Sequence, residues 1–259
     1  MSVTNHTYKF VRSLAMRKYR LQHRCFVAEG PKAVRDLLPL MPCRILFAEE
    51  PFTDEAQRLM QAGAQVDELC LVSHAELERL SSLPAPRGAV AVFHLPEAED
   101  DGVVPPEWTQ LPARELCLAL DGVQDPGNVG TILRTADAFD CDGVFLVNAC
   151  ADPYSPKTAR ATMGAVFRRD VYQCTADELC ALLQKSNLPL YGTALRNDTV
   201  SLRDAELSRA AVAIGSEGRG LSAEILSKCE KTIKIPMSPR CESLNAAVAA
   251  SVVLWEMYR

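Results

Sequence analysis

Short apolar segments alternate with helical patterns along the second half of the chain, and this alternation limits its possible folds more than any other feature. Apolar runs of strand length lie at 115–120, 143–147, 190–194, 210–214 and 232–235. Helical patterns lie at 129–139, 156–163 and 176–184 and from 244 onward. Strands that are apolar along their whole length are typical of a parallel sheet covered by helices on both faces. The sequence therefore predicts an α/β domain.

The first part of the chain shows a smaller pattern of the same kind. Strands are predicted at 44–48, 69–72 and 89–94. Helices are predicted at 10–22, after Pro31, at 53–61 and after Ser73, which forms a capping-box signature with Glu76. Between the two patterns, prolines and acidic residues form a stretch that packs poorly. We predict an N-terminal domain over residues 1–96, a linker over 97–113 and a C-terminal domain over 114–259.

The composition excludes several classes of protein. With 48% hydrophobic and 24% charged residues, the chain has the composition of a folded globular protein. It has no run of roughly 18 uncharged apolar residues and no apolar N-terminal signal segment, so we expect a soluble cytoplasmic protein without membrane association. The ten cysteines occur singly and the four histidines do not sit at ligand spacing. We therefore expect reduced core cysteines and no metal site.

Polar, glycine-rich segments follow three of the predicted strands, at 121–130, 215–220 and 236–245. In the first segment, Pro126 stiffens the turn and Asn128 is placed to cap the following helix. Arg134 lies four residues after Gly130 and therefore on the same helix face. A well-formed strand-to-helix turn and a solvated arginine are the structural alternatives. Ligands of parallel sheets bind beyond the carboxyl ends of the strands, so the three segments together predict one site.

The second and third segments add a carboxylate and a helix start. Glu217 lies among three glycines that leave the backbone accessible, although their spacing is not that of a dinucleotide-binding fingerprint. No phosphate-binding P-loop occurs in the chain. Ser243 and Asn245 stand where the last helix begins, and free amides and the helix dipole favour polar ligands there. Capping of this helix by Ser243 is the alternative explanation.

In this order, the three segments resemble the motifs of the SpoU (TrmH) family of RNA ribose 2'-O-methyltransferases, within the SPOUT superfamily. The matching sequences are DGVQDPGNVGTILRT at 121–135, AIGSEGRGLS at 213–222 and IPMSPRCESLNAA at 235–247. The sequence FVAEGPK at 26–32 is similar to the ribosomal-protein-like RNA-binding domain of the family. One departure is Asp140, where the family usually has a glycine after the helix that contains the first of these motifs.

The resemblance implies a fold, a cofactor and a set of site residues. The C-terminal domain would be a parallel-sheet α/β domain with a trefoil knot, and the N-terminal domain a small α/β RNA-binding unit. The cofactor would be S-adenosylmethionine, gripped largely by backbone atoms. The cofactor-binding residues implied are Ala213, Gly215, Gly220, Ile235, Met237 and Leu244. The catalytic residues implied are Asn128, Arg134, Glu217, Ser243 and Asn245.

The resemblance also suggests a role for each catalytic residue. We expect Arg134 to orient the 2'-hydroxyl and its neighbouring phosphate, because a guanidinium stays protonated at neutral pH and is therefore a poor base. Its charge would stabilise the developing alkoxide. Glu217 and Ser243 would hold the network that positions Arg134 and the cofactor. Asn128 and Asn245 would orient the substrate and the loops.

The N-terminal segment is locally basic, although the whole chain has a net charge of −5. Residues 1–35 contain eight lysines and arginines and one acidic residue. Basic side chains bind phosphates without base specificity, so this segment is predicted to bind the backbone of structured RNA. The predicted contacts are Arg12, Arg17, Lys18, Arg20 and Arg24. A solvated helix face is the alternative.

Several alternatives for the function stay open at this point. Ribosomal RNA is the favoured substrate because family enzymes that act on transfer RNA often lack the N-terminal domain, and transfer RNA is the alternative. A non-catalytic RNA-binding module is disfavoured by the intact motif residues. A nicotinamide-dependent oxidoreductase is disfavoured by the missing fingerprint. Family resemblance also implies a homodimer, to which the apolar last helix over 246–255 would contribute.

Overall fold

The computed structural model describes residues 3–95, 116–241 and 243–259, so the predicted linker at 97–113 lies outside the described residues. The chain divides into two compact units. Unit 1 contains residues 1–97 and 154–167, and unit 2 contains residues 98–153 and 168–259. Within the described ranges, no helix is long and apolar enough to cross a membrane.

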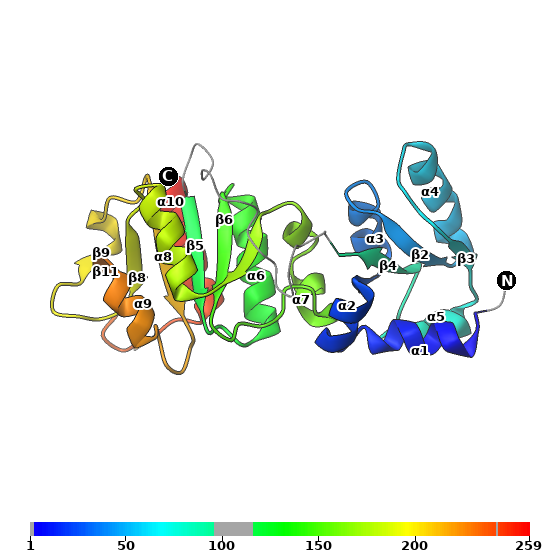
Figure 1. Ribbon diagram of the computed structural model, residues 1–259, viewed down its shortest axis with the longest axis horizontal. Helices are drawn as coiled ribbons and strands as arrows, with labels where there is room; N and C mark the ends of the chain where they lie inside the picture. Colours follow the sequence, from blue (N-terminus) through cyan, green and yellow to red (C-terminus); the bar gives the residue numbers. More distant parts are fainter. Residues whose placement is uncertain (1–2, 96–115, 242) are drawn as a thin grey trace. The chain divides into compact units, whose positions relative to one another are not determined.

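Unit 1 is built on a four-stranded sheet (Figure 1). The strand order is β1 (Cys25–Glu29), β4 (Ala89–His94), β2 (Cys43–Ala48) and β3 (Leu69–Leu71). Strand β4 runs antiparallel to both of its neighbours, and β2 pairs with β3 in parallel. Successive side chains point to opposite faces, so Val90 and Val92 enter one core while Ala91 and Phe93 enter the other.

Helices cover both faces of this sheet (Figure 1). Helices α1 (Asn5–Ser13) and α5 (His74–Leu80) pack on one face, and α3 (Pro31–Leu37) and α4 (Glu50–Gln61) pack on the other. Pro31 occupies the first turn of α3, and Ser73 and Glu76 form the predicted capping box of α5. Both of these sequence signals are confirmed. Strand β1 was not among the strands predicted from the sequence.

The predicted basic helix at 10–22 is wrong, because the chain breaks there into two helices. Helix α1 ends at Ser13, and α2 (Arg17–His23) begins after a turn. The guanidinium of Arg20 donates to the carbonyls of Leu14 and Ala15, each at 2.7 Å. A helix end leaves carbonyls without partners, and the buried arginine satisfies two of them.

A segment from the second half of the sequence, Tyr154–Phe167, packs within unit 1. It contains α7 (Pro156–Ala161) and two rings that contact Phe26, with ring centroids of Tyr154 and Phe167 at 5.9 and 4.8 Å. These contacts give the ring of Phe26 an aromatic cover. The predicted domain limits stay a prediction, and this segment is the part of residues 114–259 that lies in unit 1.

A buried carboxylate fastens the same segment to β1. Glu29 is 6% exposed and accepts hydrogen bonds from Ser81 Oγ at 3.0 Å, Ser82 N at 3.1 Å and Ser82 Oγ at 2.9 Å. Arg160 of α7 lies 3.5 Å from the carboxylate and donates to Ser82 Oγ at 3.1 Å. A buried charge is costly unless it is paired and hydrogen-bonded, and this network meets both conditions.

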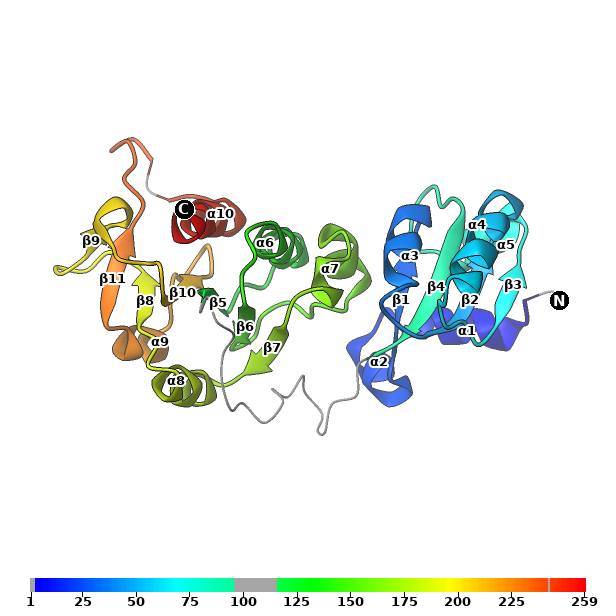
Figure 2. The ribbon, with the colours of Figure 1, turned by 90° about the horizontal axis from the view of Figure 1, so that it is seen from above.

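Unit 2 is built on a seven-stranded sheet in which every neighbouring pair is parallel. The strand order is β7 (Val171–Cys174), β6 (Gly143–Val147), β5 (Leu116–Asp121), β10 (Ala210–Gly215), β8 (Leu190–Thr193), β11 (Lys231–Lys234) and β9 (Val200–Ser201). Figure 2 shows α6 (Pro126–Ala138) and α10 (Ala246–Tyr258) on one face, and α8 (Ala176–Lys185) and α9 (Ala223–Lys228) on the other. The predicted parallel α/β fold with a separate, smaller α/β unit is confirmed. The trefoil knot stays a prediction.

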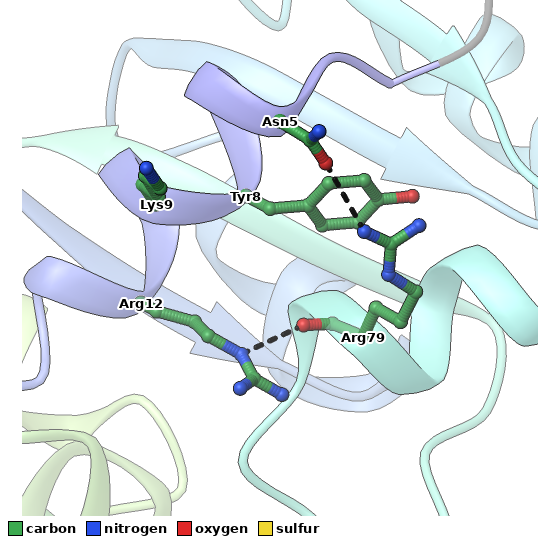
Figure 3. Close-up of a pocket in the computed structure, with 5 residues that line it drawn as sticks. All are labelled: Asn5, Tyr8, Lys9, Arg12 and Arg79. Atoms are coloured by element: carbon green, nitrogen blue, oxygen red, sulfur yellow. Dashed lines mark hydrogen bonds between the residues drawn. The ribbon is translucent and has the colours of Figure 1, made fainter.

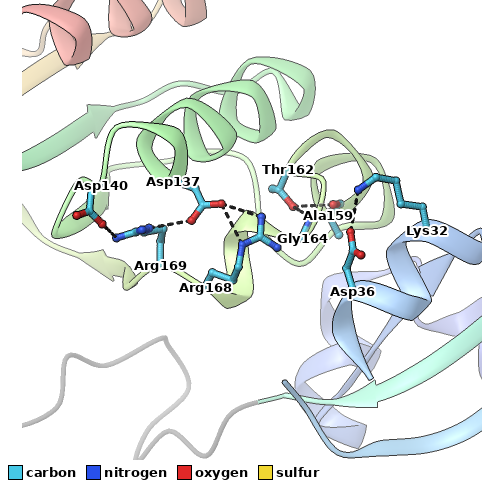
Figure 4. Close-up of polar contacts among 9 residues, drawn as sticks. All are labelled: Lys32, Asp36, Asp137, Asp140, Ala159, Thr162, Gly164, Arg168 and Arg169. Carbon is cyan, nitrogen blue, oxygen red and sulfur yellow. Dashed lines mark hydrogen bonds and ion pairs between the residues drawn. The ribbon is translucent and has the colours of Figure 1, made fainter. Parts of the chain in front are cut away.

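The end of α6 explains the departure from the family pattern at Asp140. This residue adopts a left-handed conformation with φ +52°, and Cys141 N donates to Ala136 O at 2.9 Å. That arrangement is a Schellman ending, in which glycine is the usual residue and aspartate is tolerated. The carboxylate of Asp140 forms an ion pair with Arg169 at 2.8 Å, and Arg169 also binds Asp137 (Figure 4). The helix therefore ends as a glycine would end it, with an added ion pair.

The Glu29 network makes a stability prediction. Replacement Glu29→Gln should lower the free energy of unfolding by about 1–3 kcal/mol, because it leaves buried donors without their ionised acceptor. Urea unfolding followed by circular dichroism measures the change. The matched control is Glu55→Gln, which removes a surface ion pair with Arg35 and should cost less than about 1 kcal/mol. Equal, small effects of the two variants would contradict a structural role for the network.

Candidate active site

The three polar segments of unit 2 meet at one edge of its sheet. They follow β5, β10 and β11, which are linked through parallel pairing, with β8 between β10 and β11. Parallel strands bring their carboxyl ends to the same edge, where ligands of such sheets bind. Two of the three segments also lead into α6 and α10, which pack against each other. The sequence prediction of a common site therefore has a physical basis in the fold.

A closed triangle of side chains joins the three segments. Asn128 Nδ2 donates to Glu217 Oε1 at 2.8 Å, and Asn245 Nδ2 donates to the same oxygen at 2.5 Å and to Asn128 Oδ1 at 3.0 Å. The amide of Ala246 adds a longer bond to Glu217 Oε1 at 3.3 Å. One carboxylate oxygen thus receives donors from the start of α6 and from the start of α10.

The helix caps differ from those predicted. Asp125, and not Asn128, caps α6 by accepting from Asn128 N at 2.8 Å. Gly127 leaves room for this cap, because a Cβ there would lie 2.9 Å from Asp125 Oδ1. Asn128 stands in the first turn, and its side chain is therefore available to Glu217.

Asn245, and not Ser243, caps α10. Its Oδ1 accepts from Ala247 N at 3.0 Å and Val248 N at 3.3 Å, while its Nδ2 serves the triangle. The alternative explanation of Ser243 as the cap is therefore wrong. Asn245 uses both ends of its amide, and replacing it would disturb the helix start and the triangle together.

The turn that presents Glu217 depends on a close approach of backbone to backbone. Ser216 and Gly220 form an antiparallel bridge, with N–O distances of 3.1 and 2.9 Å, and Gly220 has φ +66°. A Cβ on Gly215 would lie 2.2 Å from the carbonyl carbon of Gly220. By contrast, a Cβ on Gly218, at the tip of the same turn, would meet nothing within 4 Å. Gly215 is thus required by packing and Gly218 is not.

The sequence analysis missed Asp121, a buried residue that holds loops together at this edge of the sheet. This buried carboxylate ends β5 and accepts from Asn148 Nδ2 at 2.5 Å and from Ser222 N at 2.6 Å. It connects the loops after β5, β6 and β10. Its place directly after an apolar strand was the signal that could have identified it.

The other two predicted catalytic residues lie outside the triangle. Arg134 is exposed on α6, and its side chain forms no hydrogen bond or ion pair with any residue in the described ranges. Ser243 is also exposed, and among the described residues it is engaged through its carbonyl, which accepts from Cys241 Sγ at 3.2 Å. The structure thus brings three of the five predicted catalytic residues into contact. The roles assigned to all five stay predictions.

The predicted cofactor-binding residues divide into two groups. Gly215, Gly220, Ile235, Met237 and Leu244 lie at the ends of β10 and β11 and in the loops that follow them, and all five are partly or fully exposed. Ala213 is fully buried inside β10, between β5 and β8. We therefore leave Ala213 out of the proposed contacts.

The predicted RNA-binding residues all lie in unit 1, and four of them stay candidates. Arg12, Arg17 and Lys18 are exposed, and Arg24 is partly exposed at the end of α2. Arg20 is 3% exposed and engaged by backbone carbonyls. It is a structural arginine, and we leave it out of the proposed RNA contacts.

The cysteines of the chain are free thiols. Cys25, Cys43, Cys117 and Cys141 are buried, five others are partly buried and Cys241 is exposed, so the prediction that they belong to the core is only partly correct. Burial raises the pKa of Cys150, which follows β6, to about 11. Burial also raises the pKa of Cys229, beside Gly192, to about 11. Both are protonated near neutral pH and are poor nucleophiles.

Comparison with known proteins identifies the family. Residues 115–255 match the SpoU rRNA methylase family, and residues 5–91 match the MRM3-like substrate binding domain. The chain belongs to the SpoU rRNA methylase family. The resemblance of the three motifs to this family is thereby confirmed, and with it the prediction of a methyltransferase.

Relatives of this SpoU-family chain match it over nearly its whole length. It is 29% identical to the 23S rRNA (guanosine(2553)-2'-O)-methyltransferase RlmP of Bacillus subtilis, with 99% of this chain and 97% of that protein covered. An AdoMet-bound rRNA methyltransferase from Sinorhizobium meliloti is 28% identical with a TM-score of 0.83, and 99% of this chain and 95% of that chain are covered. The SpoU methyltransferase AviRb from Streptomyces viridochromogenes, in complex with AdoMet, is 26% identical with a TM-score of 0.83, and 99% and 98% are covered. Both units of the chain therefore have counterparts in these proteins.

The two glycines of the Glu217 turn make a matched pair for a test. Gly215→Ala should lower the melting temperature by several degrees and weaken cofactor binding at least tenfold, because the new Cβ collides with the backbone of Gly220. Gly218→Ala should leave both quantities close to wild type. Differential scanning calorimetry and isothermal titration calorimetry measure them. A Gly215→Ala variant as stable as Gly218→Ala would show that the turn can open at no cost.

Proposed function

We propose that this SpoU-family protein transfers the methyl group of S-adenosylmethionine to a ribose 2'-hydroxyl of ribosomal RNA. The observation that carries the proposal is the Asn128–Glu217–Asn245 triangle, which ties the three family motifs together at the carboxyl edge of the sheet. Relatives named as rRNA methyltransferases and the match to a substrate binding domain support the choice of substrate. Two neighbours with bound AdoMet support the choice of cofactor.

The residues at the sheet edge suit S-adenosylmethionine. Leu195 and Met237, which follow β8 and β11, are large apolar side chains that are 78% and 41% exposed. Nucleoside sites combine apolar walls with a few backbone donors and acceptors, and Gly215 and Ile235 offer backbone at the same edge. We assign the cofactor to the backbone of Gly215, Gly220, Ile235 and Leu244, with Met237 as an apolar contact. The bound cofactor would supply a methyl group on a positively charged sulfur.

The protein's part in the reaction is alignment and electrostatic stabilisation. Holding the ribose oxygen in line with the methyl group turns a bimolecular encounter into a step within one complex. The Asn128–Glu217–Asn245 triangle serves this purpose by holding the starts of α6 and α10 and the turn after β10 in fixed positions. Glu217 acts as the acceptor that orders both asparagines, and it is a positioning residue in this scheme.

Arg134 is the residue that we assign to the ribose. Its guanidinium has no partner among residues 3–95, 116–241 and 243–259, so it is available to a ligand. A guanidinium presents donors in a fixed plane that matches phosphate and oxyanion geometry. Arg134 would hold the 2'-hydroxyl and the adjacent phosphate and stabilise the charge that develops on the oxygen. Ser243, in the loop that follows β11, would add a further contact to the ribose.

The decisive experiment is methyl transfer to separate pools of RNA. Wild-type protein with labelled S-adenosylmethionine should methylate unmodified ribosomal RNA and leave transfer RNA unlabelled. Arg134→Ala should lower the rate by about 100-fold or more, as loss of one oxyanion donor does, with an unchanged melting temperature. Lys185→Ala, which removes an exposed charge from α8 on the other face of the sheet, should retain full activity.

Each outcome of this experiment is informative. Methylation of transfer RNA alone would replace the substrate, and methylation of neither RNA by the wild type would overturn the function. Arg134→Ala at the wild-type rate, with unchanged RNA binding, would remove Arg134 from the mechanism. A trefoil knot and a cytoplasmic location stay predictions that this experiment does not address.

We also propose that the protein is a homodimer formed through α10. Val248, Val252, Trp255 and Tyr258 follow one another at helical spacing on this helix, and they are between 36% and 56% exposed. The rings of Trp255 and Tyr258 pack against Phe139, the residue that follows α6, with ring centroids 5.7 Å apart in both pairs. An ordered apolar stripe of this kind is typical of a protein–protein interface.

The dimer proposal is tested by a charge in the stripe. Val252→Glu should shift the protein from dimer to monomer in light scattering, because the partner would have to bury an unpaired carboxylate. Leu40→Glu is the control, since Leu40 is a similarly exposed apolar residue in unit 1. A wild-type protein that is already monomeric at micromolar concentration would overturn the proposal.

A further inference from the structure

A pocket of about 390 Å³ lies on unit 1, whereas the family motifs of the candidate active site lie on unit 2. Its lining comes from α1 and α5 and consists of Asn5, Tyr8, Lys9, Arg12 and Arg79 (Figure 3). Every one of these side chains has a polar group, and three of them are cations. Three cationic side chains at one pocket suit an anion.

Tyr8 supplies an independent sign that a ligand belongs here. Its side chain is only 6% exposed, and its hydroxyl has no hydrogen-bond partner among the described residues. Buried polar groups in native proteins are almost always satisfied, so an orphaned hydroxyl at a pocket indicates a missing partner. A ligand with acceptor oxygens would provide that partner once the side chains that cover the hydroxyl move aside.

The charged side chains are held in place around the tyrosine. The guanidinium of Arg79 lies 3.9 Å from the Tyr8 ring centroid and donates to Asn5 Oδ1 at 3.4 Å. Arg12 Nε donates to the carbonyl of Arg79 at 2.9 Å, which leaves its terminal nitrogens without a partner in the described chain. Lys9 forms no contact of this kind with the described residues and is exposed.

One carboxylate beside this group, that of Glu76, offsets part of its positive charge. Glu76 lies on α5 near Tyr8, and it is engaged by Ser73 N and Ser73 Oγ, both at 2.9 Å, in the capping box of the helix. Its second oxygen accepts from Val3 N at 3.4 Å. The three cations therefore outnumber the acidic groups at the pocket.

We propose that this pocket binds a phosphate of the RNA backbone and so positions the substrate on unit 1. This inference rests on the proposed function, because the RNA is the substrate named there. All five lining residues fall within the match to a substrate binding domain at 5–91. Arg79 covers a face of the Tyr8 ring, and the remaining groups are donors that suit phosphate oxygens. Contacts of this kind position an RNA without reading its sequence.

The test compares two sets of three charge removals in the full-length protein. The pocket variant carries Lys9→Gln, Arg12→Gln and Arg79→Gln. The control variant carries Lys32→Gln, Arg35→Gln and Arg58→Gln, on α3 and α4 at the opposite face of the same sheet. Filter binding of an unmodified ribosomal RNA transcript, over a series of salt concentrations, gives the dissociation constant and its salt dependence.

The pocket variant should bind the transcript at least tenfold more weakly near 0.1 M salt, a threshold chosen from the size of phosphate contacts in general. The slope of log Kd against log salt should fall by about 1 for each phosphate that the variant no longer neutralises. The control variant should stay within about threefold of wild type, as expected for charges remote from the bound phosphates. Equal weakening in the two variants, or no weakening in the pocket variant, overturns the proposal.

A subtler variant separates binding from a structural role. Tyr8→Phe removes only the orphaned hydroxyl, so the free protein should be as stable as wild type or more stable. Its affinity for the transcript should fall about threefold to tenfold, the effect of one hydrogen bond to a charged group. Reduced stability with unchanged affinity would show that the hydroxyl serves the fold alone and would overturn its role in binding.

Two further measurements are needed. One distinguishes an RNA phosphate from a free phosphate, and the other distinguishes failure of the pocket proposal from failure of the proposed function. The first measures the melting temperature with inorganic phosphate or AMP. If either raises it in wild type but not in the pocket variant, while RNA affinity is equal in both, the pocket binds a free phosphate. Methyl transfer at saturating RNA should be retained in the control variant. Absence of methyl transfer in wild type would count against the function, whereas weaker RNA binding in the pocket variant alone concerns the pocket.

Discussion

The hydrogen bonds that converge on Glu217 Oε1 are the constraint on which the rest of the site depends. Asn128 and Asn245 come from the first turn of one helix and the cap of another, and they are 117 residues apart in the chain. A carboxylate that accepts from both, and from the amide of Ala246, fixes two helix starts to one turn. The positive ends of helix dipoles favour this negative charge. The spacing of the three loops is thereby defined by side chains that are remote from one another in the sequence.

This arrangement is possible only because other residues perform the usual tasks of the loops. Asp125 caps α6, which frees the side chain of Asn128, and Gly127 makes room for that cap. Gly215 lets the backbone of the following turn fold back on itself, which presents Glu217 to the two asparagines. The buried carboxylate of Asp121 accepts from Ser222 N and so fixes the end of the loop that follows β10. The polar triangle thus rests on a layer of caps and close backbone contacts whose residues need not touch a substrate.

The sequence was sufficient for the parallel sheet, the two α/β units and the capping box of α5, because these depend on local periodicity and on residues a few positions apart. It was insufficient where a long-range partner decides the role of a residue. Asn128 and Ser243 both have the chemistry of a helix cap, yet a neighbouring Asp125 or Asn245 takes that position. Arg20 has the charge of an RNA contact, but a break in the helix six residues earlier turns it inward to free carbonyls. In each case, local propensity offers several equivalent uses, and tertiary packing selects one.

The segment Tyr154–Phe167 shows the same limit at the level of domains, and it changes how the two units should be regarded. Its position between β6 and β7 in the sequence assigns it to the methyltransferase fold, while its contacts place it in unit 1. Phe26 receives aromatic cover from Tyr154 and Phe167, and the buried Glu29 receives an ion pair from Arg160. Residues 1–95 alone therefore lack part of their own core and part of the network that makes a buried carboxylate tolerable. The chain passes from one unit to the other three times. Unit 1 is therefore completed by a segment that lies, in the sequence, between two strands of unit 2.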